Sequence, residues 1–79
     1  MVRYIVSSII MDGAIAKKTL TEARVVAKRE AVKLFKLNKK YPNDKWVTID
    51  KYTTAGSVLL EGWRWTGTKF IQQIMKGMI

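Results

Sequence analysis

The sequence contains no cysteine and no histidine, and these two absences remove several familiar kinds of active site. Without cysteine the fold has no disulfide and no thiolate metal site, which fits a reducing, cytoplasmic location. Without histidine it lacks the commonest metal ligand and the usual general base near neutral pH. We therefore expect a protein that holds no metal and no cofactor.

Acidic residues are also scarce, since six Asp and Glu face fifteen Lys and Arg, for a net charge of +9. The six acids are scattered, without the paired spacing of a carboxylate couple or a cation site. The five glycines are separated, so no phosphate-binding loop is formed. These patterns predict a binding protein and not an enzyme.

Long apolar runs are missing as well, and no segment approaches the roughly 18 apolar residues that a membrane span needs. The apolar residues 2–11 are interrupted by Ser7 and Ser8, so we interpret them as a strand and not as a signal peptide. A hydrophobic content of 48% nevertheless excludes disorder. The length of 79 residues predicts one small domain, residues 1–79, with a thin core.

Local signals predict a hairpin, a helix and a second hairpin. Residues 3–11 are rich in Tyr, Val and Ile, and the Asp-Gly pair after them favours a tight turn, so residues 14–18 are predicted to form the returning strand. Residues 45–53 and 57–65 alternate between apolar and polar side chains on either side of another glycine turn. Residues 68–79 fit either a short helix or a further strand.

The predicted fold class is therefore α+β, a ββαββ arrangement. An antiparallel sheet of about four strands carries one long amphipathic helix on one face. Thr19 and Glu22 form a capping box that starts this helix, and Pro42 ends it. The predicted core face of the helix consists of Ala23, Val26, Ala27, Ala31, Leu34, Phe35 and Leu37.

The predicted helix also carries most of the charge, because nine of the fifteen cations lie between residues 17 and 40, with only Glu22 and Glu30 among them. A helix built for solubility usually alternates Glu with Lys, so this excess favours binding to DNA or RNA. We expect phosphate contacts with little sequence specificity. The cations opposite the core face are Lys28, Arg29, Lys33, Lys36, Lys39 and Lys40.

Two valines lie among these cations, and they support an alternative. Val25 and Val32 would suit contact with an acidic protein surface, as in a small regulator or inhibitor. The ββαββ layout resembles that of many short phage and bacterial proteins, which range from nucleic-acid binders to inhibitors of host enzymes. A helix lying on an anionic membrane is the weaker alternative, because the core uses its apolar face.

A second candidate surface is the sheet face turned away from the helix. Strand alternation places Val47, Ile49, Val58 and Leu60 toward the helix and four aromatic residues on the other face. This aromatic face has three possible uses. We favour cover by the carboxy-terminal segment; a symmetric homodimer through this face comes second and base stacking third. With aromatics and cations on opposite sides, we expect phosphate binding without stacking. The four aromatic residues are Trp46, Tyr52, Trp63 and Trp65.

Overall fold

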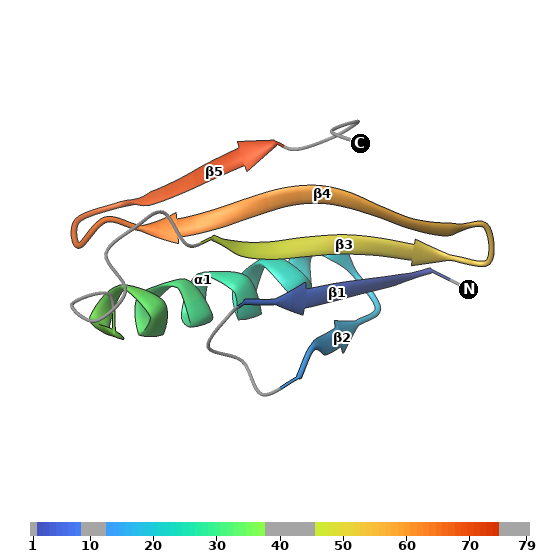
Figure 1. Ribbon diagram of the computed structural model, residues 1–79, viewed down its shortest axis with the longest axis horizontal. Helices are drawn as coiled ribbons and strands as arrows, with labels where there is room; N and C mark the ends of the chain where they lie inside the picture. Colours follow the sequence, from blue (N-terminus) through green and yellow to red (C-terminus); the bar gives the residue numbers. More distant parts are fainter. Residues whose placement is uncertain (1, 9–12, 38–45, 75–79) are drawn as a thin grey trace.

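One α-helix packs against one face of a five-stranded antiparallel sheet (Figure 1). The computed structural model describes residues 2–8, 13–37 and 46–74. The strand order is β2-β1-β3-β4-β5, so β3 is central and β2 and β5 are the edges. The elements are β1 (Arg3–Ser7), β2 (Ile15–Lys17), α1 (Leu20–Leu37), β3 (Val47–Thr53), β4 (Gly56–Trp65) and β5 (Phe70–Ile74).

This architecture confirms the predicted α+β class and corrects the number of strands. The segment that follows β4 returns as β5 and pairs antiparallel with it, from Trp65 opposite Phe70 to Glu61 opposite Ile74. It therefore extends the sheet sideways and is a strand, one of the two predicted alternatives. Because β5 lies beside β4, it does not pack across a sheet face as we had favoured (Figure 1).

The turns follow from glycines that adopt positive φ. Gly56 has a φ of 131° where β3 turns into β4, and Gly13 has a φ of 119° shortly before β2. Such angles strain any residue with a Cβ, which explains the choice of glycine at both places. Asp12, the other half of the first predicted turn, lies outside the described residues.

The start of α1 is fixed by its predicted cap. The hydroxyl of Thr19 accepts a hydrogen bond from the amide of Glu22 at 3.2 Å and donates one to the Glu22 carboxylate at 3.1 Å. The carbonyl of Thr19 accepts the first helical bond, from the amide of Ala23 at 3.1 Å. Thr19 is thus the N-cap. The predicted end of the helix before Pro42 lies outside the described residues.

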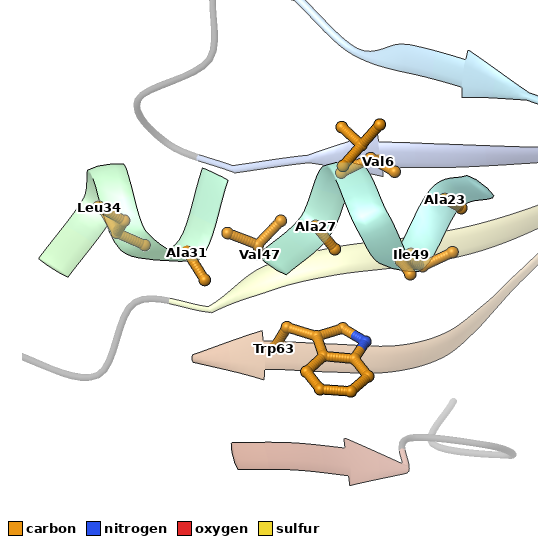
Figure 2. Packing of buried hydrophobic residues seen from close by; sticks show 9 residues of the cluster. Val6, Ala23, Ala27, Ala31, Leu34, Val47, Ile49 and Trp63 are labelled. Atoms are coloured by element: carbon orange, nitrogen blue, oxygen red, sulfur yellow. The ribbon is translucent and has the colours of Figure 1, made fainter. Parts of the chain in front are cut away.

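The core forms where α1 crosses β1, β3 and β4 (Figure 2). Three alanines on the helix leave room for the larger side chains of the sheet, so helix and sheet approach closely. The buried apolar residues are Val6, Ala23, Val26, Ala27, Ala31, Leu34, Val47, Ile49 and Trp63.

Two residues of the predicted core face are instead exposed. Phe35 is 40% exposed and Leu37 is 47% exposed, whereas Glu30 is only 8% exposed. The buried stripe of α1 is narrower than the sequence pattern predicts, and Phe35 lies beyond its edge, near β4 and β5.

A β-bulge in β4 reverses the facing of its carboxy-terminal half. Ile49 pairs with Glu61 while Asp50 pairs with Leu59, so Leu60 is the extra residue. One inserted residue moves every later side chain to the other face of the sheet. As a result Glu61 and Trp63 point toward the helix, and the prediction that placed Trp63 and Trp65 on the far face is wrong.

Candidate nucleic-acid interface

The face of α1 turned away from the sheet carries exposed cations. Lys28, Arg29, Lys33 and Lys36 are all exposed, and Val25, between them and the amino terminus of the helix, is 60% exposed. Arg29 and Lys36 are two turns apart, about 10 Å along the axis. The helix thereby aligns its cations in a row. Lys39 and Lys40, which we predicted for the same face, lie outside the described residues.

Few acids neutralise this row. Among the described residues, Glu30 pairs with Lys33 at 3.1 Å, and no acid forms an ion pair with Lys28, Arg29 or Lys36. Glu30 itself is largely buried, so it reduces the charge of Lys33 without presenting a carboxylate to solvent. Three cations remain available to an anion, with Lys33 partly so.

Lys28 also contacts aromatic rings. Its ammonium lies 4.9 Å from the ring centre of Trp63 and 5.7 Å from that of Phe70, both within cation–π distance. Trp63 is in the core, and Trp65 packs against the core from the same side. The aromatic residues of β4 and β5 therefore adjoin the basic face of α1, opposite to what the sequence pattern predicts.

The far face of the sheet keeps the other two predicted aromatics. Trp46 lies under the guanidinium of Arg64, whose central carbon is 5.3 Å from the ring centre, and Tyr52 is 45% exposed. Asp50 is on this face between Ile5 and Leu59, its partners on the neighbouring strands. Burial raises the pKa of Asp50. Its carboxylate makes this face less suitable for phosphate than the face of α1.

The four predicted stacking residues are consequently divided between two faces. Trp63 and Trp65 lie beneath the helix side, while Trp46 and Tyr52 lie on the far side, where no other described element covers them. The structure does not bring the four together as one surface.

Glu61 is the residue that the sequence reasoning missed. It is 2% exposed and accepts four hydrogen bonds: two from Arg24 at 2.9 and 3.0 Å, one from the indole of Trp63 at 2.6 Å and one from Gln72 at 3.1 Å. The group ties α1 to β4 and β5. Strand alternation alone does not predict this, because Glu61 faces the core only through the bulge.

The charges of this group are satisfied internally. Burial acts to raise the pKa of Glu61, but the hydrogen bonds from Arg24, Trp63 and Gln72 and the charge of Arg24 outweigh it and hold that pKa below its ordinary value. The hydrogen bond to Glu61 raises the pKa of Arg24. Arg24 is therefore a structural cation and does not add to the binding row.

Other kinds of site find little support within residues 2–8, 13–37 and 46–74. No group of three or more acidic side chains gathers there as a metal site would require. Among those residues no helix is both long and apolar enough to cross a membrane. Comparison with protein-family models, with curated proteins and with solved structures finds no match to the chain.

Proposed function

We propose that this protein binds nucleic acid, with the exposed cations of α1 contacting the phosphate backbone. The observation that carries the proposal is the row formed by Lys28, Arg29 and Lys36, whose members are exposed and have no acidic partner among the described residues. Like charges on one helix face repel one another, and a bound polyanion removes that cost. A cytoplasmic location and the absence of an enzymatic reaction are part of this proposal.

Phosphate contacts position a protein without specifying bases, so we expect weak sequence preference. Three to five neutralised phosphates predict that log affinity for duplex DNA falls with log salt at a slope between about −3 and −4.5. Fluorescence anisotropy with a labelled duplex measures this slope. Absence of binding, or binding that salt does not weaken, would refute the proposal.

A pair of charge reversals localises the contact. Lys36→Glu changes the row on α1, and Lys18→Glu makes the same change at an exposed lysine before the helix. We expect Lys36→Glu to weaken binding and to reduce the salt slope by about one or more, because one phosphate contact is lost. Lys18→Glu, as the matched control, should have the smaller effect. Equal effects would indicate only a response to net charge.

A second candidate function is docking on an acidic protein surface. It is favoured by Val25, which is 60% exposed among the cations and contributes nothing to phosphate binding. Apolar contacts between cations are typical of protein interfaces. Val25→Ser should leave nucleic-acid affinity unchanged, whereas it should weaken a protein complex. Recovery of a nuclease-resistant protein partner, lost in this variant, would favour docking over nucleic-acid binding.

A further inference from the structure

An aromatic patch lies beside the basic face of α1, at the flank where β5 extends beyond the helix. Phe70 of β5 is 37% exposed, and its ring centre lies 4.6 Å from that of Trp65, its partner on β4. Phe35 is 40% exposed and lies against Gly67, in the turn that joins β4 to β5. We call Phe35, Trp65 and Phe70 the aromatic patch.

The patch has a rigid foundation. The ring of Phe70 meets buried Trp63 edge to face at 6.3 Å, and the indole of Trp63 is in turn fixed by its 2.6 Å hydrogen bond to Glu61. A ring held from beneath offers its outer surface to a ligand at a small cost in conformational entropy. The patch is therefore a preformed surface.

Charge adjoins the rings directly. The ammonium of Lys28 lies over both Trp63 and Phe70, so the row of cations on α1 is continuous with the patch. Single-strand binders combine these two elements, cations that follow the backbone and aromatic rings on which bases stack. The far face of the sheet also places a cation on an aromatic ring, Arg64 over Trp46, but its centre holds the carboxylate of Asp50, which repels phosphate.

We infer that the nucleic acid bound by α1 is single-stranded, and that its unpaired bases stack on Phe70, Trp65 and Phe35 while Lys28 and its neighbours contact the phosphates. This inference rests on the proposed function and names its substrate. A duplex hides the faces of its bases, so only a single strand uses both the patch and the cations. An acidic peptide would meet the same cations but has no bases to stack on the patch.

The test compares three labelled ligands of about 12 nucleotides: a single strand, its duplex, and an abasic strand with the same phosphates but without bases at its centre. Anisotropy titrations give the three affinities for the unmodified protein. We expect the single strand to bind more tightly than either the duplex or the abasic strand.

Phe70→Leu then removes the aromatic ring and keeps apolar volume. It should weaken binding of the single strand by about 5- to 150-fold, the range measured for loss of one base stack, and leave the abasic strand nearly unchanged. Tyr52→Leu, on the far face and also exposed, is the matched control and should change neither affinity. Phe35→Leu repeats the test at a residue of another element.

The outcomes separate the two proposals. If none of the three ligands binds with salt dependence, the proposed function itself fails. If binding is salt-dependent but the single strand, the duplex and the abasic strand bind alike, the function stands and the stacking inference is overturned. Equal losses for the normal and the abasic strand in Phe70→Leu and in Phe35→Leu would also overturn stacking, because damage to the fold explains them.

Discussion

Neutralising Glu61 should weaken the packing of the helix on the sheet, because its carboxylate accepts four hydrogen bonds from side chains of three elements. In Glu61→Gln the size is nearly unchanged, but one acceptor oxygen becomes an NH₂ donor. At the Oε2 position the new donor would face the donors of Arg24, Trp63 and Gln72, so it would turn to the Oε1 position and face Arg24. At least one charge-assisted hydrogen bond is lost.

The size of the effect follows from burial. Breaking a buried ion pair by removing one charge costs about 3–5 kcal/mol. The side chain of Arg24 is 40% exposed, and water replaces part of its bonding. We therefore expect the free energy of unfolding to fall by about 2 kcal/mol, a large share of the roughly 4–12 kcal/mol usual for a chain of this length.

The same group predicts a pH dependence. The pKa of Glu61 is lower in the folded protein than its ordinary value of 4.5, so the folded state binds fewer protons than the unfolded chain. The contribution of Glu61 is present above that ordinary value and is lost as the pH falls below it. Glu61→Gln should remove this part of the acid destabilisation.

Urea unfolding followed by circular dichroism at neutral and acidic pH measures both effects. Glu22→Gln is the control, since Glu22 is exposed and its side chain bonds to Thr19 across the first turn, with no other side-chain partner among the described residues. It should cost less than about 0.5 kcal/mol. Similar losses of stability in the two variants at neutral pH, or the full acid dependence in Glu61→Gln, would refute this role of Glu61.

Three further changes test the fold, each by urea unfolding. Thr19→Ala removes the N-cap of α1 and should lower the free energy of unfolding by about 1 kcal/mol. Unchanged stability would contradict the role of Thr19 as the cap. Ala27→Leu overfills a fully buried position in the core between helix and sheet and should cost about 1–3 kcal/mol, whereas a neutral result would mean that the core is loosely packed. Gly67→Ala places a Cβ 3.0 Å from Phe35 at a φ of 101°, so it should cost more than Gly13→Ala, where the space is open; equal costs would count against that contact.

The sequence is sufficient to predict the helix and the strands, but not which face of the sheet each side chain of β4 lies on. Thr19 predicts the helix cap because its hydroxyl can accept a backbone hydrogen bond, and Gly56 predicts the turn because it tolerates positive φ. The helix and the second hairpin can therefore be predicted from local signals. The bulge at Leu60 is visible in the pairing of β4 with β3, and the alternation of side chains along the sequence does not reveal the extra position. That single residue reversed the predicted facing of Trp63 and Trp65.

The candidate site was affected in the same way. The exposed cations of α1 could be found from periodicity, because helical spacing alone defines a face. The contact of these cations with aromatic rings could not be found in this way. It depends on β5 being a strand beside β4 and on Trp63 lying on the helix side of the sheet, where its ring and that of Phe70 contact Lys28. The expectation of phosphate binding without stacking rested on the wrong facing, and the structure removes its basis.

The central claim is that the cations of α1 bind the backbone of a nucleic acid. The most direct test is the affinity for a labelled single strand at about 50 and 200 mM salt, for the unmodified protein and for Lys36→Glu. Three to five phosphate contacts predict a loss of about 20- to 130-fold between these concentrations, and a smaller loss for Lys36→Glu. No binding, or an affinity that changes less than about threefold, would contradict the account.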